Sequence, residues 1–328
     1  MRLISRIIAG TVLAVLAYIA VGGVIVATAR PIKLRGELVD IGGRRLHLIC
    51  EGPRGQGPTV LFEAGAFGFS ADWGVVQARV AAQGRRACSY DRAGLGLSDP
   101  GPAPRDGLAV ADDLERLLRA AREDGPYVLV GHSMAGLYLR LFANRNPDKI
   151  AGLVLVDAVT PEVSETPQVR KFVEAFIRGS QWASLGAQAG LYAPFARTWF
   201  GDKIGLTPEA SAEKRRAFVS PQHNKWAAAE VGEWMRTAAE AKATGPLNPD
   251  WPVAVVTAGT GHRRTGRAAQ QASPARLSRH GYEDSVAQAG HATLLGVKYA
   301  DAVVRAVDHV LQAKAKPAVR ERGAAVTS

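Results

Sequence analysis

The sequence predicts an α/β fold, in which a mostly parallel sheet is covered by helices on both faces. Short runs such as 59–62 and 150–156 are apolar throughout, as expected of strands that are buried on both faces. These runs alternate along the chain with stretches whose apolar residues recur at helical spacing. The chain has 328 residues, which suits one large α/β domain that carries an insertion.

The predicted elements begin with a hairpin and end with an amphipathic helix. Strands are predicted at 38–41, 45–50, 59–62, 87–90, 127–130, 150–156 and 253–256, and a weaker strand at 285–287. Helices are predicted at 73–82, at 110–121, from residue 134 or 135 to Pro147, and at 300–311. The domain is therefore expected to span residues 36–312.

Between Pro161 and Pro252 the strand signal is absent. Helical stretches are predicted around 169–177, 213–219 and 226–241, so residues 160–250 are expected to form a helical cap over the sheet. Aromatic residues are interleaved with these helices. We expect most of them to join the cap to the body, and one or two to line an apolar pocket. The aromatic residues are Trp182, Tyr192, Phe195, Trp199 and Phe200.

Residues 7–29 carry no charge, and basic residues flank them on both sides. As a helix this run reaches ~35 Å, enough to cross a hydrocarbon core of ~30 Å. Residues 1–35 are therefore interpreted as a membrane anchor that places the domain outside the cytoplasm. The small residues Ala27 and Ala29 also fit a cleavage site, which leaves a cleaved signal and a secreted protein as the alternative. Residues 313–328 are small and basic and are expected to form a disordered tail.

Basic residues outnumber acidic ones, with 41 Lys and Arg against 30 Asp and Glu, for a net charge of +11. No zinc-finger, RNP-type or basic-zipper signature accompanies this charge, so a nucleic-acid partner is not expected. Five arginines lie within 263–279, and we expect them to form a solvated helix face or, alternatively, to attract anionic substrates or lipid head groups. Two cysteines are too few for a disulfide scaffold or a Cys-rich zinc site, and no metal or cofactor is expected.

Residues 131–136, Gly-His-Ser-Met-Ala-Gly, follow a predicted strand directly and open the next predicted helix. A serine on so sharp a turn has a strained backbone and stands above the sheet, where its hydroxyl is free to attack. The helix N-terminus favours the negative charge that develops there. The motif resembles the nucleophile elbow G-x-S-x-G of the α/β-hydrolase family, with Ser133 as the nucleophile and Ala135 in place of the second glycine.

Three further stretches resemble the same family in the expected order, and they are 63–66, 90–99 and 289–291. The resemblance covers residues 38–311 apart from the cap and implies an eight-stranded sheet. It also implies that the backbone N–H groups of Ala66 and Met134 form the oxyanion hole. Glu63 stands where the family usually has histidine, and a structural ion pair with Arg92 is expected for it.

The resemblance places the catalytic histidine at His291, after the last predicted strand, with His262 as the rival. Many members of the family carry the acid after the seventh strand, but residues 251–282 contain no Asp or Glu. Some lipases of this fold take the acid from the end of the sixth strand, where Asp157 stands. Asp157 is therefore predicted as the acid, and Glu162 is the next candidate. The other interpretation of Asp157 is a carboxylate that only caps the loop.

The other histidines and the cysteines receive structural interpretations. His47 lies within a strand and His309 on the final helix, and the side chain of His132 is expected to point away from that of the neighbouring serine. Cys50 and Cys88 lie on strands that are neighbours in the family's sheet order. Two buried free thiols are expected, with a bond as the alternative outside the cytoplasm.

Together these residues imply a serine hydrolase that acts on carboxylic esters, with an apolar acyl or aromatic group, through an acyl-enzyme. His291 would make Ser133 nucleophilic, and Asp157 would orient His291. A serine at this position argues against the haloalkane dehalogenases and epoxide hydrolases of this fold, which use Asp there. One alternative is other Ser-His-Asp chemistry, as in cofactor-free haloperoxidases or C–C bond hydrolases. Another is a non-catalytic ligand-binding receptor on a hydrolase scaffold.

Overall fold

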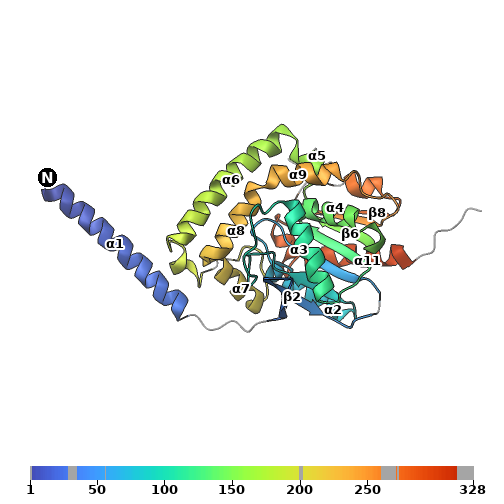
Figure 1. Cartoon of the computed structure of the whole chain (residues 1–328), viewed down its shortest axis with the longest axis horizontal. Coiled ribbons are helices and arrows are strands. Elements are labelled where there is room, and N and C mark those ends of the chain that lie inside the picture. Colours follow the sequence, from blue (N-terminus) through green and yellow to red (C-terminus); the bar gives the residue numbers. More distant parts are fainter. Residues whose placement is uncertain are drawn as a thin grey trace, which may run out of the picture.

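An eight-stranded sheet forms the centre of the computed structural model, which describes residues 2–28, 35–55, 57–198, 202–259, 271 and 273–315 (Figure 1). The strand order is β1-β2-β4-β3-β5-β6-β7-β8. β2 pairs antiparallel with both β1 and β4, and all the other pairs are parallel, which confirms the predicted mostly parallel sheet. The strands are β1 (Glu37–Asp40), β2 (Arg45–Glu51), β3 (Thr59–Glu63), β4 (Ala87–Tyr90), β5 (Tyr127–His132), β6 (Ile150–Val156), β7 (Val253–Ala258) and β8 (Gly281–Val286).

Helices cover both faces of the sheet. Along β3, Val60 and Phe62 belong to the core beneath α2 and α11, whereas Leu61 belongs to the core beneath α3 and α4. Because both faces are buried, both alternating sets of side chains are apolar, and this accounts for the uninterrupted apolar runs. The four helices are α2 (Gly74–Ala82), α3 (Gly107–Ala120), α4 (Ala135–Arg145) and α11 (Ala300–Ala315).

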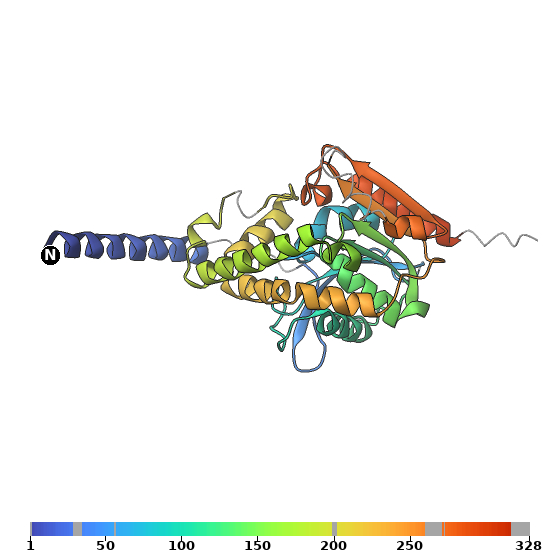
Figure 2. The same ribbon diagram turned by 90° about the horizontal axis from the view of Figure 1, so that it is seen from above.

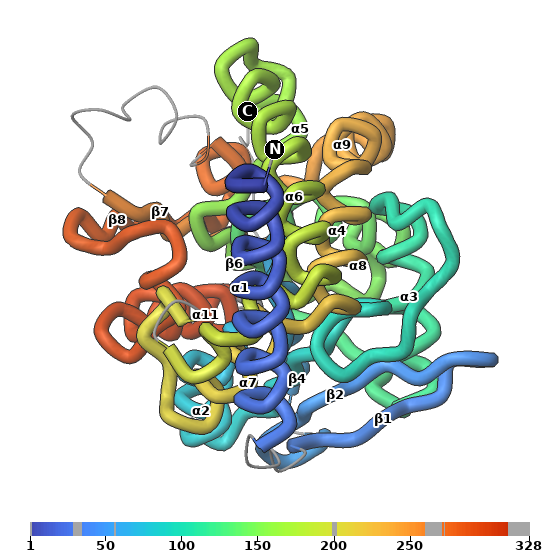
Figure 3. The backbone as a smooth tube through the Cα atoms, turned by 90° about the vertical axis from the view of Figure 1, so that its left-hand side faces the viewer, coloured from blue at the N-terminus to red at the C-terminus, as the bar shows by residue number. Residues whose placement is uncertain are grey.

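The insertion between β6 and β7 is helical, and its helices are α5 (Pro161–Ser164), α6 (Pro167–Gln188), η3 (Ala193–Phe195), α7 (Pro208–Val219), α8 (Pro221–Gly232) and α9 (Trp234–Ala243). α6 packs on α8, while α9 packs on α3 and α4 (Figures 1 and 3). The single helical stretch predicted at 226–241 is wrong, because the chain turns at Glu233 into a second helix. The turn places Trp234 in the core beside α4, which a straight continuation of α8 against α6 would not reach.

Other predicted boundaries also differ from the structure, and two of these differences lie near the C-terminal end. The last strand, predicted at 285–287, is β8 at Gly281–Val286. It lies at the edge of the sheet with alternately exposed side chains, so it lacks the apolar run that marks a central strand. Residues 313–315, predicted as tail, belong to α11.

Several predictions fall outside the described residues. They concern Ala29, Trp199, Phe200, His262, Arg263, Arg264, Arg267 and the tail from 316 to 328.

α1 (Arg2–Ala27) extends away from the rest of the molecule (Figures 1 and 2). It is long and apolar enough to cross a membrane, with a mean hydropathy of 2.3 over 18 residues, and almost all of it is exposed. Its last turns contact η3 of the insertion. Signal sequences and membrane anchors share this length, composition and position in the chain.

Cys50 and Cys88 form a disulfide bond, so the expectation of two free thiols is wrong. The two residues are directly opposite each other in the antiparallel pair of β2 and β4, with 4.1 Å between their Cα atoms. Strand register brings the two sulfur atoms together, and register is not readable from either strand alone.

Candidate active site

Ser133 lies on a sharp turn between β5 and α4, as the motif predicts. Its φ of +57° is in the left-handed region, which is uncommon for a residue with a side chain. Small residues permit the turn: a Cβ on Gly131 would lie 2.6 Å from Leu139 Cδ1, and a Cβ on Gly136 would lie 2.4 Å from the carbonyl oxygen of Val159. The methyl group of Ala135 is accommodated and fully buried.

His291 and Asp157 meet at the same edge of the sheet. Asp157 directly follows β6, and His291 lies in the loop after β8. His291 Nδ1 donates a hydrogen bond of 2.5 Å to Asp157 Oδ2, which leaves Nε2 available toward the cavity. Burial disfavours the charged form of Asp157, but the hydrogen bond and charge of His291 outweigh it, and the pKa of the carboxyl is lowered. The carboxylate is therefore charged at neutral pH.

Within the described part of the chain, the Ser133 hydroxyl and two nearby backbone N–H groups form no internal hydrogen bond. Among the described residues, none bonds the hydroxyl, and none accepts a hydrogen bond from the backbone N–H of Ala66 or Met134. Gly65 brings the loop after β3 close to the serine, since a Cβ there would lie 2.9 Å from Ser133 Cβ. The Ser133 hydroxyl thus adjoins two backbone N–H groups that have no acceptor among the described residues.

Arg92 binds two backbone carbonyl groups of the loop after β3. Its Nη1 donates to the carbonyl of Ala64 at 2.6 Å, and its Nη2 donates to the carbonyl of Gly65 at 2.9 Å. In a trans peptide the carbonyl of one residue and the N–H of the next point in opposite directions, so the second bond fixes the direction of the Ala66 N–H. The predicted ion pair of Arg92 with Glu63 is confirmed, with 2.6 Å between Nη1 and Oε1, and Glu230 of α8 pairs with the same guanidinium.

His132 is a site residue that the sequence reasoning missed. Its ring packs against that of His291, with 4.4 Å between centroids, and its Nε2 is 3.0 Å from the carbonyl oxygen of His291. Burial and the neighbouring His291 lower its pKa from 6.5 to about 3, so it is neutral and adds no charge beside His291. The only available signal was its adjacency to Ser133, because the loop that brings His291 over it comes from the far end of the domain.

A cavity of about 870 Å³ opens over these groups. Ser133, Asp157, His132 and His291 line one side of it, and helices of the insertion line the other. The insertion contributes a largely apolar wall that includes Val163, Val169, Phe172, Phe176, Tyr192, Phe218 and Trp234. Of the aromatic residues considered from the sequence, Tyr192 lines the cavity and Trp182 is exposed.

The other candidates lie away from the cavity. The side chain of Glu162 is 59% exposed and pairs with Arg140 at 2.9 Å, so it is not beside His291. His309 stacks on Tyr282 and is part of the packing of the last helix.

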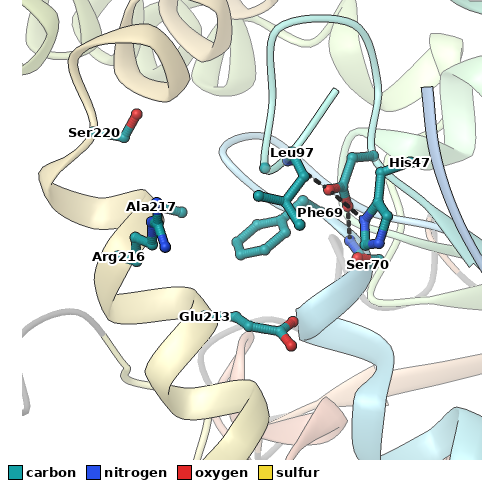
Figure 4. A pocket seen from close by; sticks show the side chains of 10 residues that line it. His47, Phe69, Ser70, Leu97, Glu213, Arg216, Ala217 and Ser220 are labelled. Carbon is teal, nitrogen blue, oxygen red and sulfur yellow. Dashed lines mark hydrogen bonds and ion pairs between the residues drawn. The ribbon is translucent and has the colours of Figure 1, made fainter. Parts of the chain in front are cut away.

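A second pocket, of about 180 Å³, contains His47 (Figure 4). His47 Nδ1 lies 2.9 Å from Asp91, and its Nε2 lies 2.5 Å from the carbonyl oxygen of Arg35. Glu213, at the other side of the pocket, pairs with Arg35. The polar groups are bonded to each other, which is the structural role predicted for His47.

The described residues include one close group of candidate metal ligands, Cys50, Cys88 and Glu123. The two sulfur atoms are joined to each other and so offer no thiolate. Glu123 pairs with Arg54 and Arg86.

Comparison with known proteins agrees with this architecture. A family model described as alpha/beta hydrolase fold matches residues 58–262, more than half of the chain. An AB hydrolase superfamily protein of Gibberella zeae is 31% identical over 136 residues, which cover 38% of this chain and 42% of the relative. An uncharacterized vacuolar membrane protein of Saccharomyces cerevisiae is 36% identical over 105 residues, which cover 31% of this chain and 16% of the relative. The chain spans less than half the length of these curated relatives.

Among solved structures, a thermophilic esterase from Thermogutta terrifontis has a TM-score of 0.61 and 21% identity, and the match covers 85% of this chain and 100% of the esterase chain. At this identity the similarity shows the fold alone. The sheet order, the turn at Ser133 and the match to the family over more than half of the sequence agree with one another. The chain therefore belongs to the α/β-hydrolase fold family.

Proposed function

We propose that the protein is a serine hydrolase that cleaves carboxylic esters through an acyl-enzyme. The observation that carries the proposal is the meeting of Ser133, His291 and Asp157 at one cavity, with the 2.5 Å hydrogen bond between the last two. The carboxylate holds the tautomer in which Nδ1 is protonated, and it stabilises the imidazolium that forms during the reaction. His291 Nε2 is then the general base.

The reaction proceeds in two halves. Ser133 Oγ attacks the ester carbonyl carbon while His291 takes the hydroxyl proton, and the N–H groups of Ala66 and Met134 bind the oxyanion. His291 returns the proton to the leaving alcohol, and the acyl group remains on Ser133. Water then gives a proton to His291 and attacks the carbonyl carbon of the acyl-enzyme. When the resulting tetrahedral intermediate collapses, His291 returns this proton to Ser133 Oγ, the acyl–Oγ bond breaks, and the carboxylic acid is released.

The cavity supports the proposed substrate class. Its volume of about 870 Å³ is toward the upper end of the ~300–1,000 Å³ of small-molecule sites. Phe172, Phe176 and Trp234 are in ring contact along the insertion side, which favours an apolar acyl or aromatic group there. In this proposal residues 160–250 act as a cap that selects the substrate.

We propose that α1 is retained and anchors the protein, with the domain outside the cytoplasm. Its length and apolar surface support an anchor. The bond between Cys50 and Cys88 supports an oxidising compartment. A mature N-terminus at Arg30 would instead identify a cleaved signal.

Labelling with a fluorophosphonate tests the nucleophile. We expect covalent label on the wild type, loss of label in Ser133→Ala, and full label in Ser180→Ala. Ser180 is a matched control, because it lines the same cavity and its hydroxyl donates to the carbonyl of Ile177. A series of p-nitrophenyl esters of increasing acyl length then measures selectivity. A wild type that takes no label and hydrolyses no ester would favour the ligand-binding receptor.

A further inference from the structure

The last turns of α1 are packed against one segment of the insertion, 190–197. The Tyr18 hydroxyl donates to the carbonyl of Leu191 at 3.0 Å. Gly22 is buried, and a Cβ there would lie 2.6 Å from Pro194 Cδ. The proposed anchor and the domain are therefore in close contact, and a side chain larger than that of glycine would not fit at position 22 without a shift.

The position of this contact along α1 determines how deep segment 190–197 lies when α1 spans a membrane. It begins at Tyr18 and continues to Thr28, whose carbonyl accepts from Arg197 Nη2 at 3.0 Å. At ~1.5 Å per residue this is ~15 Å of helix, close to half of the apolar run 7–29. The residues before Tyr18 reach only ~17 Å, short of the ~30 Å hydrocarbon core. If α1 spans the bilayer, segment 190–197 must lie at the depth of its outer part.

The surface next to this segment has the composition of a membrane interface. Trp182 and Leu185 of α6 are exposed, as is Leu191, and Trp182 is 73% exposed. Lys171 and Arg178 are exposed on the same side of α6 at helical spacing, with the exposed Glu174 between them, so basic residues exceed acidic ones by one among these three. Tryptophan favours the headgroup region, and basic side chains bind lipid phosphates.

α6 lies between this surface and the cavity. In Figure 1, α6 runs across the direction of α1 rather than along it. In Figure 3, which views the molecule from the end where α1 extends, α1 lies in front of the insertion helices. Its opposite side lines the cavity through Val169, Phe176 and Ser180. One helix thus separates the candidate nucleophile's cavity from the surface that adjoins the anchor.

We propose that Lys171, Arg178, Trp182, Leu185 and Leu191, here called the α6 face, dock on the phospholipid bilayer that holds α1. The docked face places the cavity at the lipid surface, so the substrates are esters dissolved in the membrane. This inference rests on the proposed anchor and deepens the proposed ester hydrolysis.

Site-specific fluorescence measures the docking. The full chain carries one added cysteine, Leu191→Cys or Leu277→Cys, labelled with NBD without reductant and reconstituted into phosphatidylcholine–phosphatidylglycerol vesicles. Leu277 is a matched control, a 68% exposed leucine outside the α6 face. We expect a blue-shifted emission that doxyl-labelled lipids quench at position 191, and water-like emission at 277. Water-like emission at both positions, in protein that floats with the vesicles, overturns the inference and leaves the anchor intact.

Ester hydrolysis in vesicles tests the consequence of docking for access of the substrate to the cavity. We expect Trp182→Glu to lower kcat/KM at least tenfold for a long-chain ester within vesicles, and to leave kcat/KM for soluble p-nitrophenyl acetate unchanged. Leu277→Glu should change neither. An equal loss on both substrates, or on neither, contradicts docking as the route to substrate. Protein that fails to float refutes the anchor and the docking together. If the wild type hydrolyses no ester, ester hydrolysis fails, while the fluorescence result on docking stands by itself.

Discussion

Replacing Asp157 by asparagine removes the charge that holds His291 and keeps the shape of the side chain. The bond to His291 is 2.5 Å, and the carboxyl is buried and held in its charged form by a lowered pKa. Among the described residues, the other carboxylate that lines the cavity is Asp72, which pairs with Lys214 at 2.7 Å and so does not substitute for Asp157. In serine proteases the equivalent change costs about 10⁴ in kcat, or about 5.4 kcal/mol of transition-state stabilisation. We expect Asp157→Asn to lower kcat by at least ~10³.

Glu162→Gln is the matched control, because Glu162 lies five residues further along the chain, in α5, and pairs with Arg140 at the surface. A surface ion pair is worth about 0–1 kcal/mol, so kcat should change less than about tenfold. The assay is hydrolysis of a p-nitrophenyl ester, with active sites titrated by the fluorophosphonate and the fold checked by circular dichroism. Near-normal turnover in Asp157→Asn would refute the assignment of Asp157 as the acid that orients His291. A loss of kcat of ~10³ or more in Glu162→Gln would instead assign that role to Glu162.

Further outcomes are expected at three other places. In Gly65→Ala the new Cβ would lie 2.9 Å from Ser133 Cβ, so the loop after β3 must move. We expect kcat to fall by about 10²–10³ and KM to change little. The control is Gly232→Ala, where nothing lies within 4 Å of the new Cβ, and it should keep wild-type kinetics. Burial lowers the pKa of His223 from 6.5 to about 3 in the folded chain, so between about pH 6.5 and pH 3 only the unfolded chain binds the proton, and stability falls as pH is lowered. The free energy of unfolding, measured in urea at pH 7 and at pH 5, should therefore fall less in His223→Gln than in the wild type, by about 2 kcal/mol. If the wild type and the variant lose the same amount, the reasoning is contradicted. The double change Cys50→Ala with Cys88→Ala opens a loop with a sequence separation of 38, and should lower the free energy of unfolding by about 2–4 kcal/mol while kcat is retained.

Much of the fold was predictable from local patterns. The central strands were recognised because a strand buried on both faces must be apolar at every position, and β6 was predicted with its observed bounds, Ile150–Val156. The edge strand β8 was misplaced because solvent reaches its side chains and the pattern fades. The helix break at Glu233 was missed because both halves favour helix, and only packing against α4 and α6 separates them.

The sequence by itself determined the elements whose signal is local: the apolar strands, the sharp turn at Ser133 with its small neighbours, and the long apolar α1. Only the tertiary structure decided which distant residues meet. It placed Asp157 rather than Glu162 beside His291, packed His132 against the same ring, and joined Cys50 to Cys88. These contacts depend on strand register and on loops far apart in the chain. Periodicity within one segment reports which side of that segment is buried, and it carries no information on the partner that buries it.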